Sequence, residues 1–221
     1  DTWETRAVHR SARLVSGPVW SADGSELLFL EASTDCRQII LKRAAAAGGT
    51  AVAVHSFPAS RKVVHEMVSG AGDPDPEKTR AWLHLALNET RRMVALELPV
   101  SEEELHTCVF DLVAWRPLGT FERLLAPAWS SDGSQLACVE LGAEGRIGGV
   151  RLFAVRGEQI VEGRSMVFPG ARGSDFPPSL AWSPDSRRIV TTDGESVWLF
   201  HTDGSKPGEK KGPGGCAGFL P

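Results

Sequence analysis

One phrase recurs three times along this chain, and it limits the possible folds more than any other feature. In each copy a tryptophan is followed by Ser, one variable residue, Asp, and Gly or Ser, and then by a short apolar run. The phrase occupies residues 18–25, 127–134 and 180–186, and the apolar runs occupy 27–30, 136–139 and 189–192. Each copy predicts a strand, a tight turn and a second strand. Repetition of such a unit at intervals of tens of residues predicts a repeat architecture.

The sequence after each copy extends the unit to three or four strands. Further strands are expected at 37–43 and 50–57 in the first unit, at 150–155 and 159–168 in the third, and at 196–201 in the last. A degenerate unit between the first and third is expected to have strands at 82–87, 93–96, 107–113 and 115–124, with Ala86 in the place of the tryptophan. Residues 69–79 read as an exposed loop inserted before it.

The residue types of the phrase are suited to structural roles in the fold. A tryptophan on an inner strand can pack its large ring between neighbouring sheets. An Asp-Gly pair supplies the backbone freedom that a tight hairpin needs. Recurrence at every turn is what a folding motif predicts, so we interpret Asp23, Asp132 and Asp185 as turn residues rather than catalytic or metal-binding ones.

Trp-Ser-x-Asp-Gly/Ser followed by an apolar run resembles the repeat of TolB-like β-propellers. It is also similar to divergent WD repeats, in which 109–112 would match the end of a third strand. The chain has no Gly-His pair opening a repeat and no Trp-Asp pair closing one, which favours the TolB-like type. The resemblance covers residues 14–205 and implies an all-β propeller of four-stranded antiparallel blades, about four of them, near residues 14–68, 80–124, 125–170 and 178–205.

The last unit lacks a convincing fourth strand. Residues 206–221 are rich in Gly, Pro and Lys and are expected to form a flexible tail after a propeller domain of residues 1–205. Residues 5–15 are a possible closing strand, since an unpaired sheet edge invites aggregation. Because four-bladed rings are uncommon, we favour the alternative that the chain is part of a larger, incomplete propeller.

Composition excludes some classes of function. The net charge of the 221 residues is −4 and no basic stripe is visible, which disfavours nucleic-acid binding. The apolar runs are too short to cross a bilayer, so no membrane insertion is expected. The four cysteines show no close pair or metal-ligand spacing, which favours free thiols and, weakly, an intracellular location.

No catalytic, cofactor-binding or metal-ligating residue is predicted, because no nucleophile elbow, zinc helix or phosphate loop occurs and the six histidines stand singly. In propellers the loops around the central channel usually carry function. The connections 16–18 and 170–178 and the loops with Arg146 and with Glu102 to Glu104 are expected on one rim, although that acidic run also reads as a solvated loop. Candidate partner-binding residues are Arg172, Asp175, Phe176 and Arg146.

The preferred function is a non-enzymatic scaffold that binds one or more proteins through its rim loops. The resemblance leaves open the propeller domain of a prolyl-oligopeptidase-like serine hydrolase, whose catalytic residues would lie on a separate domain. A propeller that binds a small ligand or sugar is a weaker third possibility. Neither the partner nor a ligand can be identified from the residues.

Overall fold

The structure is a computed structural model that describes residues 7–69, 83–142, 147–168, 178–192 and 196–213. The chain forms two compact units, Asp1–Leu85 with Leu98–Glu103 and Ala86–Glu97 with Glu104–Pro221. The first sheet and the helix lie in the first unit, and the third and fourth sheets lie in the second. The second sheet is divided between them.

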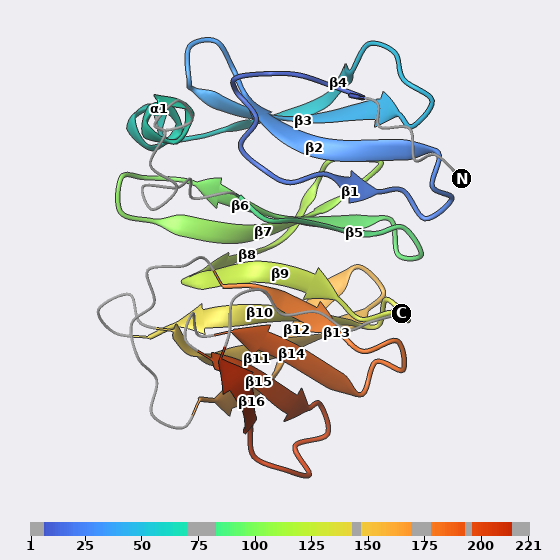
Figure 1. Ribbon diagram of the computed structural model, residues 1–221, viewed down its shortest axis with the longest axis vertical. Helices are drawn as coiled ribbons and strands as arrows, with labels where there is room; N and C mark the ends of the chain where they lie inside the picture. The colour runs from blue at the N-terminus through green and yellow to red at the C-terminus, as the bar shows by residue number, and fades with distance from the viewer. Residues whose placement is uncertain (1–6, 70–82, 143–146, 169–177, 193–195, 214–221) are drawn as a thin grey trace. The chain divides into compact units, whose positions relative to one another are not determined.

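The described residues form four antiparallel sheets, each of four strands that lie side by side in chain order (Figure 1). The first sheet contains β1 (Val19–Trp20), β2 (Glu26–Ala32), β3 (Gln38–Ala45) and β4 (Val52–Pro58). The second contains β5 (Leu85–Asn88), β6 (Met93–Pro99), β7 (Leu105–Asp111) and β8 (Pro117–Glu122). The third contains β9 (Leu124–Trp129), β10 (Gln135–Leu141), β11 (Ile147–Arg156) and β12 (Gln159–Val167), and the fourth contains β13 (Leu180–Trp182), β14 (Arg188–Thr192), β15 (Ser196–His201) and β16 (Glu209–Pro213). The all-β fold predicted from the repeats is confirmed.

The recurring Ser-x-Asp phrase forms the hairpin between the first two strands, as predicted. In the third sheet the Asp132 carboxylate accepts hydrogen bonds from Ser130 Oγ at 2.6 Å and from the Ser134 amide at 3.0 Å. Gly133 adopts the left-handed conformation with φ 67°, which costs glycine nothing. In the first sheet the amide of Ser25 and the hydroxyl of Ser21 lower the pKa of Asp23 to about 2. The carboxylates of these aspartates are therefore hydrogen-bonded to residues of their own turns.

A Ser-x-Asp turn of the same kind also lies between β2 and β3, where the repeats do not predict it. Ser33 Oγ donates to Asp35 Oδ1 at 2.6 Å, and the Cys36 amide donates to the Ser33 carbonyl oxygen at 3.1 Å. Cys36 takes the place of the glycine, with φ 57°. The Ser-x-Asp pair therefore shapes this turn even without a glycine.

The tryptophans link the sheets of the second unit. Trp129 Nε1 donates to the carbonyl oxygen of Ala86 in β5 at 3.2 Å, and Trp182 Nε1 donates to that of Ala128 in β9 at 2.9 Å. Each indole therefore bonds to the first strand of the preceding sheet, which confirms the predicted packing between sheets for these two. Trp20 differs, because it is 59% exposed.

These contacts correct the alignment of the degenerate unit. The acceptor Ala128 immediately precedes Trp129, so the matching acceptor Ala86 immediately precedes the tryptophan position of the second sheet. That position is Leu87, and the expectation of Ala86 was wrong by one residue. The expected first strand 82–87 begins later, at Leu85, and Trp82 lies outside the described residues.

The fourth sheet has a fourth strand, so the expectation of a flexible tail was wrong for residues 209–213. β16 pairs with β15, with Leu199 opposite Glu209 and Ser196 opposite Pro213. The described part of the expected closing strand lies elsewhere: the Val15 amide donates to the Leu30 carbonyl oxygen at 3.1 Å, and Leu14 bridges to Glu31. This segment therefore extends the first sheet along β2.

Candidate functional site

The four residues predicted to bind a partner, Arg146, Arg172, Asp175 and Phe176, lie outside the described residues. Their role stays a prediction. Within the described residues, the candidate site is a charged surface of the first unit, formed by the helix α1 (Arg61–Ser69) and the loop of residues 100–103. We call it the α1 surface.

Local sequence explains α1, although the repeat pattern does not predict it. Ser60 stands at the residue before the helix, where serine is preferred, and its carbonyl oxygen accepts the Val64 amide at 3.0 Å. Apolar residues at 63, 64, 67 and 68 follow the helical period. Val64 is fully buried, while the charged side chains between these positions are exposed. The helix is thus amphipathic, with an apolar side packed on the first unit and a charged side in solvent.

Two hydrogen bonds join the segment of α1 to the loop after β6. The Ser60 amide donates to the Pro99 carbonyl oxygen at 2.7 Å, and Lys62 Nζ lies 2.7 Å from Glu102 Oε2. The hydrogen bond and charge of Glu102 raise the pKa of Lys62. This ion pair also offsets the unfavourable position of a lysine in the first turn of a helix, where the dipole is positive. The segment of α1 follows β4, the fourth strand of the first sheet, and the loop follows β6, the second strand of the second sheet. From the sequence, we expected connections of these two kinds to lie on the same rim.

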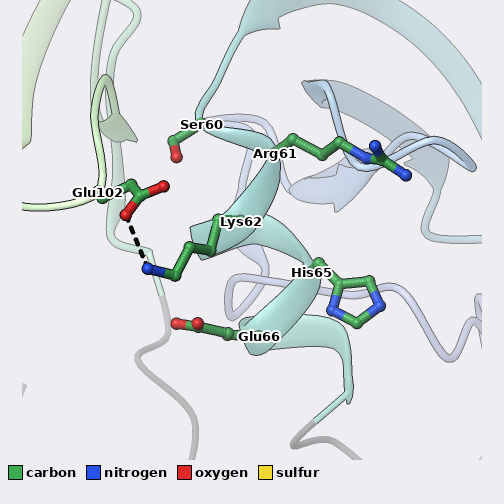
Figure 2. Close-up of a pocket in the computed structure, with 6 residues that line it drawn as sticks. All are labelled: Ser60, Arg61, Lys62, His65, Glu66 and Glu102. Carbon is green, nitrogen blue, oxygen red and sulfur yellow. Dashed lines mark hydrogen bonds and ion pairs between the residues drawn. The ribbon is translucent and has the colours of Figure 1, made fainter.

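The α1 surface surrounds an open cavity of about 470 Å³ lined by Ser60, Arg61, Lys62, His65, Glu66 and Glu102. Figure 2 shows that Lys62 and Glu66 point to the same side of the helix as Glu102, whereas Arg61 and His65 point to the other side. Lys62 and Glu102 are 59% and 60% exposed. A small ligand needs most of its surface buried. The cavity therefore suits a contact with a macromolecule better than a small-molecule site.

A second group of charges, in the first unit, is buried and internally paired. Glu31 is 3% exposed, and its carboxylate accepts hydrogen bonds from Ser11 Oγ at 3.0 Å and lies 3.0 Å from Lys42 Nζ and 3.1 Å from His9 Nε2. Burial raises the pKa of Glu31, but the hydrogen bonds of Lys42, Ser11 and His9 outweigh it and bring the pKa below its ordinary value. Because these partners hold the carboxylate, its role is to fasten residues 9–13 to β2.

The third sheet repeats this pair. Glu140 and Arg151 form an ion pair with the same eleven-residue separation as Glu31 and Lys42, again between the second and third strands. Ser165 Oγ donates to the second oxygen of Glu140 at 3.1 Å. The shared spacing is a sequence signal for this pair that the motif analysis does not use.

Another buried carboxylate supports an irregular strand. Glu97 is 2% exposed, and its Oε1 accepts the amide of Ala126 at 2.6 Å. Ala126 has φ 49° and lies beside the register shift between β9 and β10. Burial, followed by the charge of Glu97, raises the pKa of the neighbouring Cys138 thiol. This cluster is structural, because its carboxylate satisfies a buried backbone amide and its thiol stays protonated.

Three cysteines, Cys36, Cys108 and Cys138, are buried free thiols, and Cys216 lies outside the described residues. Across the described ranges, no three His, Cys, Asp or Glu side chains gather so that they could hold a metal ion. In the same part of the chain, the helix is too short and too polar to span a bilayer.

No protein-family model matches the sequence, and no curated protein matches it. Several solved structures share its fold. TolB from Acinetobacter baumannii superposes with a TM-score of 0.55 at 13% identity, over 90% of this chain and 45% of that one. A nidogen/laminin complex matches with a TM-score of 0.54 at 10% identity, over 90% and 65% of the two chains. A structure from a study of two prolyl endopeptidases matches with a TM-score of 0.51 at 13% identity, over 91% and 28%.

The chain spans less than two thirds of the length of each of these proteins. Their shared fold serves different functions, so the likeness by itself selects none of them. These three solved structures match most of the chain, including its repeats, but at sequence identities so low that the match shows only a shared fold. The four sheets are therefore blades of a β-propeller.

Proposed function

We propose that this chain is a non-enzymatic β-propeller scaffold that binds a partner protein through the connections at one end of its sheets. The observation that carries the proposal is the α1 surface. Its helix is not needed to complete a four-stranded sheet, yet it is anchored by Val64 and by the bond between Ser60 and Pro99. An added element with a buried side and a charged exposed side is suited to recognition rather than to the core.

The chemistry of this surface favours a protein partner. Arg61 and Lys62 supply positive charge, and Glu66 and Glu102 supply negative charge, so the surface offers donors and acceptors of both signs. Such a mixture complements the polar rim of a protein interface. Arginine is also enriched among interface residues that contribute much of the binding energy. The nidogen/laminin complex, whose fold is similar, is itself a protein assembly, which supports the proposal without identifying the partner.

Charge reversal at the α1 surface tests this function. The Arg61→Glu/Lys62→Glu variant should lose proteins that the wild-type chain captures from cells of its source, because it inverts the cationic part of the surface. Arg116→Glu is the matched control, since Arg116 is a similarly exposed arginine that forms an ion pair with Glu158 in the second unit. Capture would be compared by quantitative mass spectrometry after circular dichroism has shown that both variants are folded. Retention of every captured protein by the double variant would refute the proposal.

A further inference from the structure

In the second unit, the turns that follow the first strands of the second, third and fourth sheets are bonded to one another. Asn88 Nδ2 donates to the Gly133 carbonyl oxygen at 2.9 Å, which joins the turn between β5 and β6 to the turn between β9 and β10. Ser131 Oγ donates to the Ser183 carbonyl oxygen at 3.3 Å, which joins that turn to the one between β13 and β14. All three turns lie within the second unit, so they form one continuous surface. We call it the hairpin surface, and it comprises residues 88–92, 130–134 and 183–188.

Both outer turns of the hairpin surface carry two adjacent arginines. Arg91 and Arg92 lie in the turn between β5 and β6, and Arg187 and Arg188 lie where the turn between β13 and β14 ends. All four residues are exposed. In the described part of the chain, Arg91, Arg92 and Arg187 form no ion pair. Their guanidinium groups are therefore available to a partner.

The aspartates of the same surface are engaged by their own turns. Asp132 accepts hydrogen bonds within the turn between β9 and β10. Asp185 Oδ1 accepts the Ser183 hydroxyl at 2.5 Å and the Arg187 amide at 3.1 Å. These two bonds, followed by the charges of the neighbouring arginines, lower the pKa of Asp185. The positive charge of the hairpin surface therefore lies in two separate groups, with the turn of Asp132 between them.

An exposed apolar residue adjoins one of the two groups. The Arg92 carbonyl oxygen accepts the Leu112 amide at 2.8 Å, which fastens the turn between β7 and β8 to the hairpin surface. The next residue, Val113, is 58% exposed, and Ala114 is also exposed. A partner that covers an apolar side chain gains free energy by removing it from water. The neighbourhood of Arg92 is therefore suited to a segment that combines charged and apolar side chains.

We propose that the hairpin surface binds an acidic segment of a partner protein, whose carboxylates pair with Arg91, Arg92 and Arg187. Arginine presents a planar fork of donors that matches the two oxygens of a carboxylate. A polypeptide can place carboxylates at both groups of arginines and uncharged residues over Asp132, and one of its apolar side chains can cover Val113. A nucleic acid is the poorer match, because its regularly spaced phosphates would also lie over the aspartates. The proposal is independent of the α1 surface, which lies in the first unit.

Binding of an acidic peptide to the full chain tests this assignment. The probe is a fluorescein-labelled peptide in which two pairs of glutamates are separated by glycine, serine and leucine, and glutamines replace the glutamates in the control peptide. Fluorescence anisotropy should show tighter binding of the acidic probe, and the preference should fall as salt is added.

Charge reversal locates the binding site. An exposed ion pair contributes a factor of about 1.4 to 5 in affinity, and reversal replaces attraction by repulsion. Arg91→Glu/Arg187→Glu should therefore weaken binding of the acidic probe about 10-fold or more. Arg91→Gln/Arg187→Gln should weaken it less, because it removes attraction without adding repulsion. Circular dichroism would first show that the variants are folded.

The Arg37→Glu/Lys210→Glu variant is the matched control. Both residues are exposed cations outside the hairpin surface and the α1 surface, and the variant makes the same change in net charge. It should leave the affinity for the acidic probe within about 2-fold of the wild-type value, since distant surface charges are screened. Equal losses in the two glutamate variants overturn the proposal. So does a wild-type chain that does not prefer the acidic probe to its glutamine control, or one that binds single-stranded DNA of the same charge more tightly.

Discussion

The turn glycines Gly24 and Gly133 occupy the same position of the repeated hairpin but have different surroundings. Both adopt the left-handed conformation, with φ 68° and 67°. A Cβ on Gly24 would meet nothing within 4 Å, whereas a Cβ on Gly133 would lie 2.7 Å from Asn88 Oδ1. Asn88 is 5% exposed and belongs to the preceding sheet, where its Nδ2 donates to the Gly133 carbonyl oxygen at 2.9 Å. The two glycines therefore separate the cost of backbone conformation from the cost of contact between sheets.

The Gly24→Ala substitution should lower the free energy of unfolding by about 1 kcal/mol. That figure is the penalty of about 1–2 kcal/mol for alanine in the left-handed region, reduced by the smaller entropy of the unfolded chain. Gly133→Ala carries the same penalty and also displaces the Asn88 amide. Losing the hydrogen bond of a buried group adds about 1–3 kcal/mol, so Gly133→Ala should cost about 2–4 kcal/mol in total.

The cost of Gly133→Ala should also be measured in a chain that carries Asn88→Ala. Asn88→Ala removes the three atoms that lie nearest to a Cβ at residue 133, so Gly133→Ala should then cost about as much as Gly24→Ala. Since the two glycines lie in different compact units, hydrogen exchange followed by mass spectrometry in increasing urea should be used to read each unit separately. Equal costs for Gly24→Ala and Gly133→Ala, or an unchanged cost of Gly133→Ala beside Asn88→Ala, would refute the reasoning.

Three further predictions concern buried groups. Glu97→Ala should destabilise the second unit by about 1–3 kcal/mol, because it leaves the buried Ala126 amide without an acceptor. Glu97→Gln keeps an acceptor oxygen and should cost less in the same urea titration. Equal costs for the two variants would contradict the role of Glu97 as the acceptor of this amide. Glu31 has a folded-state pKa below its ordinary 4.5, so it contributes stability that is present above about pH 4.5 and is lost as pH falls below it. Lys42→Met should lower the stability of the first unit at pH 7 and flatten this acid dependence in denaturation curves, whereas an unchanged pH profile would show that Lys42 does not hold the carboxylate. Iodoacetamide should label Cys138 only after unfolding, because burial raises the pKa of its thiol; labelling of the native chain at the rate of a free thiol, mapped by mass spectrometry, would disprove this.

Local chemistry explains which parts of the fold could be predicted from the sequence. A hairpin built from Ser130, Asp132 and Gly133 depends only on neighbouring residues, so its phrase is sufficient to predict it. Trp20 and Trp182 show the limit, since nearly identical phrases leave one indole 59% exposed and the other 8% exposed. What covers an indole is decided by distant residues, and the phrase contains no information about them.

The missed elements have weaker signals. β16 runs through Glu209, Lys210, Lys211 and Gly212, which have low strand propensity, because an edge strand can be formed by backbone pairing alone. The apolar spacing of α1 and Ser60 before it were sufficient to predict a helix, but the blade repeat has no place for one. The α1 surface could not have been predicted, because Lys62 and Glu102 are forty residues apart and meet only in the folded first unit.

The indole bonds of the second unit have a direction. Trp129 and Trp182 each donate a hydrogen bond to a carbonyl oxygen of a strand that lies earlier in the chain. During synthesis from the amino terminus, a newly made sheet would find its docking carbonyl already in position. The second unit can therefore grow by successive addition, with each finished sheet acting as the template for the next.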